Sequence, residues 1–366
     1  MAGRLLQNFK LTRLSGVKQL NTIDITFIAV YFSILIVLGL FLSRKASASL
    51  EDYLLGGKKL PWWALGFSGM GSFLDVTGTA LIISFLFMLG PRGIFVEFRG
   101  GAVLVLAVWM VWAGKWHRRS NCMTGGEWMI YRFGEGFGGK FARIARAGGF
   151  IVLAVGLLAY LSKGIGLFLS MFINLSPTAC TLIMVTIVTI YTIFSGFYGV
   201  VFTDMFQSVI VLIATATISI MAFVKVSGTE QLATLAQAVV GNEAWIHTVP
   251  QWRTSMPKDY EQYQLLVMFA LFYMIRHVFG ATGDADDPKY FGARNPRECG
   301  TLSFMWIWLM MFRWPMMMGV AVLGLFLVMD FFPDQAVLLE AAEFIKAQLG
   351  AVQDTDWTDR LAEIIH

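Results

Sequence analysis

The sequence is poor in charged residues, in cysteine and in histidine. Charged side chains make up 14% of its 366 residues, against roughly a quarter in ordinary soluble domains. The three cysteines, Cys122, Cys180 and Cys299, lie far apart, and the four histidines are equally scattered. This spacing offers neither a disulfide framework nor a metal-ligand set. A net charge of only +4 gives no indication of a nucleic-acid partner.

Apolar residues, by contrast, are abundant. They make up 57% of the chain, and the mean hydropathy is +0.66. A helix that crosses a bilayer needs about 20 mostly apolar residues. Eight stretches meet this requirement, at about 24–43, 62–89, 93–114, 145–173, 178–196, 200–225, 263–281 and 302–329. We therefore predict an all-α membrane protein with about eight transmembrane helices, surrounded by a lipid bilayer.

The distribution of basic residues predicts the orientation. Residues 1–23 are mixed polar and basic, without the apolar core of a signal peptide, so we predict a tail there. The loops 44–61, 115–146 and 282–298 fall on one side of the eight helices and carry fourteen Lys and Arg residues, against nine on the other side. Because short basic loops are retained in the cytoplasm, this side is predicted to be cytoplasmic, in a multi-pass protein of the bacterial inner membrane.

The second stretch, 62–89, is not uniformly apolar. Four glycines lie in it: Gly66, Gly69, Gly71 and Gly78. Close helix packing through small residues is one explanation. A second is a broken helix whose freed backbone carbonyls line a cavity. We favour the broken helix, because the carboxylate of Asp75 is costly near membrane depth without a partner.

Three segments at the ends of the predicted spans carry a family pattern. Residues 52–63 read DYLLGGKKLPWW, residues 126–134 read GEWMIYRFG, and residues 191–207 read YTIFSGFYGVVFTDMFQ. With a weaker match at 287–295, they resemble the sodium/solute symporter family, which includes the sodium/proline and sodium/galactose symporters. The third segment is similar to the family's most specific signature, a Gly-Gly turn followed by Thr-Asp-x-x-Gln, with Ser195 in place of one glycine.

The resemblance implies an inverted-repeat transporter with a broken helix. In such folds five helices form one repeat and five more form its inverted copy, with the solute between them. The expected order is a tail 1–23, an extra span 24–43, a first repeat 62–225, an outer loop 226–262, two helices of the second repeat 263–329 and an outer loop 330–366. Because the other helices of that repeat would lie beyond His366, we expect an incomplete fold, from a fragment of a longer protein or a truncated gene.

The resemblance also implies a sodium site. Carried over residue by residue, the carbonyls of Gly71 and Leu74 fall at the family's sodium positions, with Ser72 and Asp75 beside them. A register shifted by two residues would instead align Asp75 with a carboxylate of the proline symporters. Asp204 matches the family's Thr-Asp carboxylate on the inner sodium path; alternatively, it is a charge stabilised by a helix N-terminus. Sodium prefers oxygen ligands and is the only metal implied, as the coupling ion, with no organic cofactor.

For the solute, Glu97 matches a cavity carboxylate of the sugar-transporting relatives, and Arg276 and Phe279 match cavity and inner-gate positions. The cavity lysine and glutamine of those relatives align with Met310 and Gly78, which puts a sugar in question. Arg276 either binds an anionic group of the solute through two hydrogen bonds or pairs with a carboxylate of the protein. The sequence supports both alternatives equally.

These patterns predict secondary active transport of a small solute, driven by sodium through alternating access. Proton coupling is an alternative, because Asp75 or Glu97 could bind a proton when removed from water. A membrane-embedded solute sensor with a symporter-like domain is a further alternative. An intramembrane enzyme is disfavoured, since His277 is the only histidine at membrane depth and no catalytic set completes it. A purely structural subunit would not need Asp75 and Arg276 inside the membrane.

Overall fold

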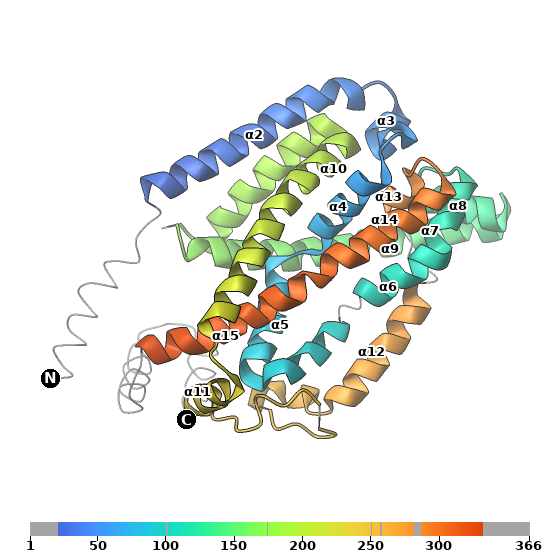
Figure 1. Cartoon of the computed structure of the whole chain (residues 1–366). Coiled ribbons are helices and arrows are strands. Elements are labelled where there is room, and N and C mark those ends of the chain that lie inside the picture. Colours follow the sequence, from blue (N-terminus) through green and yellow to red (C-terminus); the bar gives the residue numbers. More distant parts are fainter. Residues whose placement is uncertain are drawn as a thin grey trace.

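The structure of the chain is a computed structural model, which describes residues 21–99, 102–173, 175–249, 251–256, 258–281 and 287–331. These residues form helices and one isolated β-bridge, between Leu60 and Ala293 (Figure 1). The α-helices are α2 (Thr22–Ala46), α3 (Leu50–Leu55), α4 (Trp62–Phe73), α5 (Val76–Leu89), α6 (Ala102–Val108), α7 (Gly114–Ser120), α8 (Gly125–Phe133), α9 (Phe137–Ser170), α10 (Pro177–Lys225), α11 (Thr229–Val240), α12 (Leu266–Ala281), α13 (Pro288–Phe291), α14 (Pro296–Met311) and α15 (Arg313–Phe331). Shorter helical segments of other types are η1 (Gly56–Lys58), η2 (Gly90–Arg99), η3 (Trp109–Ala113) and η4 (Lys258–Tyr263).

Five helices among the described residues are long and apolar enough to cross a membrane. They are Thr22–Ala46, Val76–Val96, Phe137–Ser170, Pro177–Lys225 and Pro296–Asp330. With 49 residues, α10 contains the fifth and sixth predicted spans, and α12 supplies the seventh as a shorter apolar helix. The all-helical membrane fold predicted from hydropathy is confirmed.

The predicted break in the second span is present. Helix α4 ends at Phe73, and α5 begins at Val76. Between them Leu74 (φ −98°, ψ 84°) and Asp75 (φ −99°, ψ 151°) leave the helical region, and Figure 1 shows the extended connection. The Asp75 side chain accepts a hydrogen bond from the Gly78 N–H and thereby caps α5. The carboxylate that indicated the break therefore stabilises one of its two ends.

The fifth and sixth predicted spans, 178–196 and 200–225, are joined without a loop. Within α10 only Gly196 has a non-helical backbone (φ 54°, ψ −153°), in a region that is almost exclusive to glycine. Ser195 before it is helical and fully buried, and its hydroxyl donates to the Tyr191 carbonyl (2.7 Å). Serine is compatible with the signature at this position because the kink requires only one glycine.

The eighth predicted span, 302–329, is longer than expected and is interrupted. It begins at Pro296, and α14 gives way to α15 at Phe312. Pro315 accounts for the interruption, because it has no N–H for the Met311 carbonyl and its ring crowds that carbonyl. The sequence predicted one membrane span here, and the structure has one apolar candidate span, Pro296–Asp330, with a break inside it.

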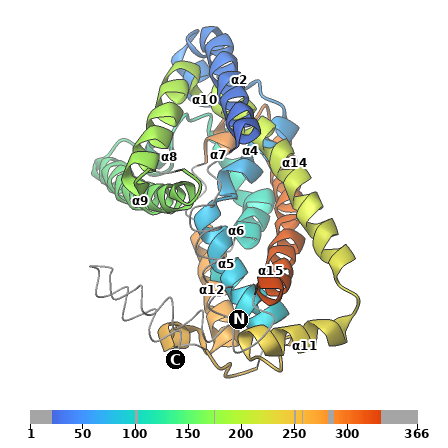
Figure 2. The same ribbon diagram turned by 90° about the vertical axis from the view of Figure 1, so that its left-hand side faces the viewer.

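The three basic loops meet at one end of the molecule. Helices α3, α7, α8 and α13 gather there (Figure 1), and Figure 2 shows α11 at the opposite end. Lys58 Nζ donates to the side chain of Asn121 (2.8 Å), and Arg294 Nε donates to the Lys59 carbonyl (2.8 Å). These contacts join the first basic loop to the second and to the third. The loops thus share one side, as the predicted orientation requires, and the second of them is largely helical.

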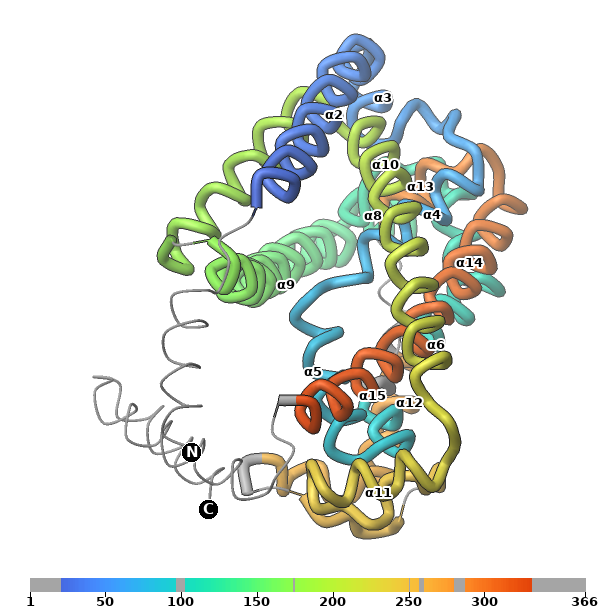
Figure 3. Tube along the Cα trace, turned by 60° about the vertical axis from the view of Figure 1, so that its left-hand side comes forward, coloured from blue at the N-terminus to red at the C-terminus, as the bar shows by residue number. Residues whose placement is uncertain are grey.

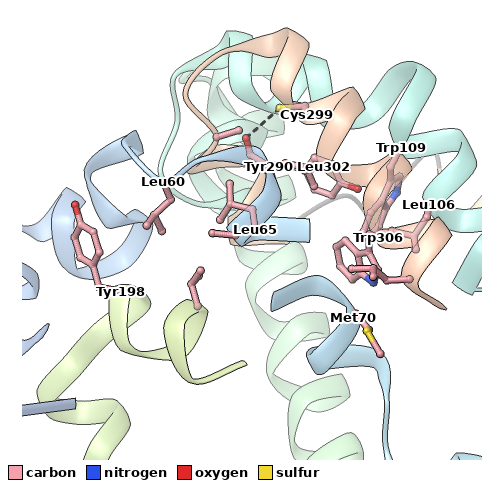
Figure 4. Packing of buried hydrophobic residues seen from close by; sticks show 14 of the residues in the cluster. Leu60, Leu65, Met70, Leu106, Trp109, Tyr198, Tyr290, Cys299, Leu302 and Trp306 are labelled. Atoms are coloured by element: carbon pink, nitrogen blue, oxygen red, sulfur yellow. Dashed lines mark hydrogen bonds between the residues drawn. The ribbon is translucent and has the colours of Figure 1, made fainter. Parts of the chain in front are cut away.

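Helix α4 lies at the centre of the largest hydrophobic cluster, between α10 and α14. Figure 3 shows the order from α2 through α10 and α4 to α14. Leu65 and Met70 of α4 are fully buried in this cluster, together with Trp306 of α14 and Val201 of α10. Figure 4 shows Leu65, Met70 and Trp306 among the buried side chains of this cluster. The broken helix is therefore held by packing on both of its sides.

Gly69 allows this close packing of α4 on α14. A Cβ atom at Gly69 would overlap the buried Trp306 ring. We expect Gly69→Ala to lower the free energy of unfolding by about 1–3 kcal/mol, as overpacked cores do, and a thermal melt in detergent measures this. Gly156→Ala is the control, because no atom lies within 4 Å of a Cβ there and alanine favours the helix. Equal melting temperatures of the two variants would contradict this packing.

Candidate functional site

Three side chains of α4 and α10 form a cluster of oxygen atoms. The Ser68 hydroxyl donates to Oδ2 of Asp204 (2.7 Å), and Ser72 Oγ lies 3.4 Å from the same oxygen. Ser72 also donates to the Ser68 carbonyl (2.9 Å). Within the described part of the chain, Oδ1 of Asp204 accepts no hydrogen bond. This oxygen can therefore serve as a ligand to a cation.

The residue spacing along both helices aligns the cluster. Ser68 and Ser72 are four residues apart, which places them on one face of α4. Asp204 and Ser208 have the same spacing on α10. The Ser208 hydroxyl donates to the Phe67 carbonyl (2.9 Å) and is fully buried. This bond fixes the register of α10 against α4.

Gly71 permits the close approach of the two helices at this point. A Cβ atom on Gly71 would lie 3.2 Å from Ser208 Oγ and 3.3 Å from the Asp204 carbonyl oxygen. The structure thus brings Gly71, Ser72 and Asp204 together, which are three of the five residues predicted to bind sodium.

The other two predicted sodium residues, Leu74 and Asp75, form the break itself. Because α4 ends at Phe73, its last carbonyls have no partner within the helix. Arg313, which is 6% exposed at the junction of α14 and α15, donates from Nη1 to the Phe73 carbonyl (3.4 Å). Gly78, predicted at the solute site, donates its N–H to Asp75. The break therefore combines backbone acceptors at the negative end of α4 with a buried guanidinium group.

The remaining residues predicted at the solute site lie on other elements. Arg276 is exposed on α12, and its guanidinium carbon lies 5.5 Å from the centroid of the Tyr273 ring. Phe279, on the same helix, is 74% exposed. Helix α12 packs against η2 and α6. Glu97 belongs to η2, and its side chain lies outside the described residues.

Lys289 was not identified from the sequence, yet it is buried beside the oxygen cluster. Its side chain is 6% exposed, and Nζ lies 3.5 Å from each carboxylate oxygen of Asp287. Nζ donates to Ser72 Oγ (3.1 Å) and lies 5.2 Å from the centroid of the Trp306 ring. Ser68 was missed as well, although its four-residue spacing from Ser72 within the glycine-rich span was a usable signal.

The backbone that carries Lys289 is well anchored. The buried hydroxyl of Tyr290 lies 2.6 Å from Ser303 Oγ, and burial raises the pKa of the Tyr290 hydroxyl well above its usual range. The hydroxyl therefore stays protonated and hydrogen-bonded. Arg118 of α7 donates to the carbonyls of Ala293 and Arg294. The backbone of α13 is thus held by contacts of Tyr290 within the helix and of the two residues Ala293 and Arg294 that follow it.

The arrangement has the chemistry of a site for a monovalent cation. Asp204, Asp287 and Lys289 together carry one net negative charge when all three are ionised. The cluster supplies carboxylate and hydroxyl oxygen, and the end of α4 supplies carbonyl oxygen. Hard alkali cations prefer these ligands.

Comparison with known proteins identifies relatives along much of the chain. Residues 53–341 match the sodium:solute symporter family. Solute carrier family 5 member 4A of Mus musculus is 28% identical over 57% of this chain and 31% of its own. Sodium/mannose cotransporter SLC5A10 of Bos taurus is 29% identical over 61% of this chain and 37% of its own. The Sodium/sialic acid symporter NanT of Aliivibrio fischeri is 23% identical, over 57% of this chain and 40% of its own. The chain thus spans about a third of the length of the first two relatives.

A solved structure shares the fold. It is described as the substrate-bound outward-open state of a Na+-coupled sialic acid symporter. The TM-score is 0.59 at 21% sequence identity, and the similarity covers 80% of this chain and 58% of the other. This likeness confirms the predicted transporter fold, and the family match covers most of the described residues. The chain belongs to the sodium:solute symporter family.

Proposed function

We propose that this chain is the ion-binding part of a secondary active transporter that moves a small solute together with sodium. The observation that carries the proposal is the oxygen cluster of Ser68, Ser72 and Asp204 beside the break between α4 and α5. Broken helices with freed carbonyls are the usual ion sites of inverted-repeat transporters. Family membership supports the same function, and two relatives are named as sodium cotransporters of mannose and of sialic acid.

In this proposal sodium binds where α4 ends and leaves along α10. The carbonyls of Gly71 and Leu74 coordinate the ion at the negative end of α4, with Asp75 beside them. Ser72 and Asp204 then receive the ion on its way toward the end where α3, α8 and α13 meet. Coupling requires that sodium and solute favour the same conformation of the protein.

The solute is proposed to bind at the other side of the break, near Gly78 and the start of α5. Glu97, Arg276 and Phe279 are the further candidates for this site. Arg276 is a donor of two parallel hydrogen bonds and would contact an anionic group of the solute. Carboxylates and amino acids therefore belong in the test beside sugars and vitamins.

The chain is a multi-pass membrane protein, and we propose the bacterial inner membrane as its location. The end formed by α3, α8 and α13 would face the cytoplasm, because it carries the basic loops. Sodium would enter from the opposite face, where α11 lies.

The function is tested in proteoliposomes that contain the complete gene product. Uptake of labelled amino acids, sugars, carboxylates and vitamins is measured with an inward sodium gradient, and again with choline in place of sodium. We expect one solute class to accumulate only with sodium, because carboxylate, hydroxyl and carbonyl oxygen atoms are the ligands that a hard alkali cation prefers. If a proton gradient alone drives equal uptake, the coupling ion is the proton and the proposed sodium coupling is wrong. Specific solute binding without any uptake would favour a sensor.

A further inference from the structure

Lys289 contacts an atom that the proposed sodium path also needs. Its Nζ donates to Ser72 Oγ (3.1 Å), and Ser72 Oγ lies 3.4 Å from Oδ2 of Asp204. A hydroxyl oxygen that accepts from an ammonium group has less electron density to offer to a second cation. Sodium that reaches Ser72 and Asp204 from the break therefore meets a positive charge that is part of the protein.

The Lys289 ammonium group is held there by a balance of contacts. Asp287 compensates part of its charge at 3.5 Å, and the Trp306 ring lies 5.2 Å away, within range of a cation–π interaction. No acidic residue other than Asp287 lies within 4.0 Å of Nζ in the described ranges. The Lys289 ammonium group therefore interacts both with Asp287 on its own segment and with Ser72 on α4.

The Lys289 side chain reaches Ser72 from the end of the molecule that is predicted to be cytoplasmic. Its helix, α13, lies beside the bridge between Leu60 and Ala293 and contacts α3 and α7. The segment that carries Lys289 therefore connects the α12–α14 region to α4 at the inner end of the ion path. Motion of one region against the other would move the ammonium group relative to Ser72.

We propose that Lys289 is a positioning residue of the sodium path. Its ammonium group competes with sodium for Ser72 and, through the charge, for Asp204, and so promotes release of the ion toward the α13 end. This inference depends on the proposed sodium-coupled transport. It adds the group that lowers the sodium affinity of the site at Ser72 and Asp204. The ion binds more tightly, and leaves more slowly, when the competing charge is removed.

The test compares Lys289→Met with Lys289→Arg and with Lys59→Met in the complete gene product. Lys59 is a control from the same end, because its side chain is exposed and makes no hydrogen bond or ion pair with the described residues. The sodium concentration that gives half of the thermal stabilisation in detergent reports affinity without transport. Sodium-driven uptake in proteoliposomes then reports turnover.

For Lys289→Met we expect the half-stabilising sodium concentration to fall about tenfold, as for the loss of a nearby like charge, while the maximal uptake rate also falls. Lys289→Arg keeps the charge and should stay close to the wild type, as should Lys59→Met. A merely structural role of Lys289 would weaken sodium binding instead. An unchanged or higher half-stabilising concentration in Lys289→Met overturns the proposal.

Two further arms keep the outcomes separate. If Lys289→Met does not fold, Lys289→Gln poses the same question, because its neutral amide can still hydrogen-bond to Ser72 and Asp287; the same fall in the sodium concentration supports the proposal and its absence refutes it. Wild-type protein without sodium-dependent stabilisation or uptake would refute the proposed transport itself. Wild-type uptake with no shift in the Lys289 variants would refute only the role of Lys289.

Discussion

Asp204→Asn is expected to shift the sodium dependence of uptake to much higher sodium concentrations. In the structure the Ser68 hydroxyl donates to Oδ2 of Asp204 (2.7 Å). The asparagine side chain keeps a carbonyl oxygen that can accept this hydrogen bond, but it removes the negative charge. Two unit charges about 4 Å apart attract by about 4 kcal/mol at an effective dielectric constant of about 20, and Lys289 offsets part of this attraction. We therefore expect the apparent sodium affinity to fall on the order of 100-fold, measured as half-saturating sodium for uptake in proteoliposomes.

The matched control for Asp204→Asn is Glu230→Gln. Glu230 is exposed on α11, at the other end of the molecule, so its loss removes a carboxylate without touching the cluster. Its half-saturating sodium concentration should equal that of the wild type. Unchanged sodium dependence in Asp204→Asn would limit the ion site to the carbonyls of Gly71 and Leu74 and assign Asp204 to packing.

Gly196→Ala is expected to have the largest effect on folding. Glycine alone adopts the backbone of this kink at little cost, and other residues there lose about 1–3 kcal/mol. A Cβ atom would also lie 2.8 Å from the Tyr53 carbonyl oxygen, a rigid backbone group. We expect a loss of more than about 3 kcal/mol in the free energy of unfolding, which exceeds a typical single-substitution effect. The yield of monodisperse protein after detergent extraction and the thermal midpoint measure this loss.

Ser195→Ala tests whether the loss of stability in Gly196→Ala comes from the backbone of the kink or from the introduction of alanine in this segment. It introduces the same residue one position earlier, where the backbone is helical, and removes only the bond from Ser195 to the Tyr191 carbonyl. A hydrogen bond inside a membrane contributes about 0.6 kcal/mol on average, so the protein should remain extractable. Equal losses from Ser195→Ala and Gly196→Ala would contradict a special role for the backbone of Gly196.

The sequence predicted the parts of the fold that depend on composition within one segment. Long apolar stretches identified the spans, and the glycines around Asp75 identified the break in the second one. The interruption at Phe312 was missed because no polar residue cluster marks it. Its only signal is Pro315, which is tolerated in membrane helices and is not decisive by itself. Helices on both sides of residues 197–199 were predicted as separate spans, whereas in the structure they form one helix with a kink at Gly196.

The candidate site was predictable only where the family signature reached it. Gly71, Ser72 and Asp204 came from aligned motifs, and the structure brings them together across α4 and α10. Lys289 lies 217 residues from Ser72, and nothing in the local sequence distinguishes it from the other basic residues of its loop. Only the fold reveals that this lysine is buried. Arg313 lies within the predicted span 302–329, but its contact with the end of α4 depends on two helix interruptions lying close together.

Each end of the break between α4 and α5 has one backbone group with a side-chain partner in the protein. Asp75 accepts from the Gly78 N–H, and Arg313 donates to the Phe73 carbonyl. A symporter completes its cycle by reorienting without cargo, and any polar backbone left unpaired at that stage would resist the step. Because these partners belong to the protein, the Gly78 N–H and the Phe73 carbonyl are hydrogen-bonded without a bound ion. In the proposed transporter, these two backbone groups would not oppose the reorientation of the protein without bound ion or solute.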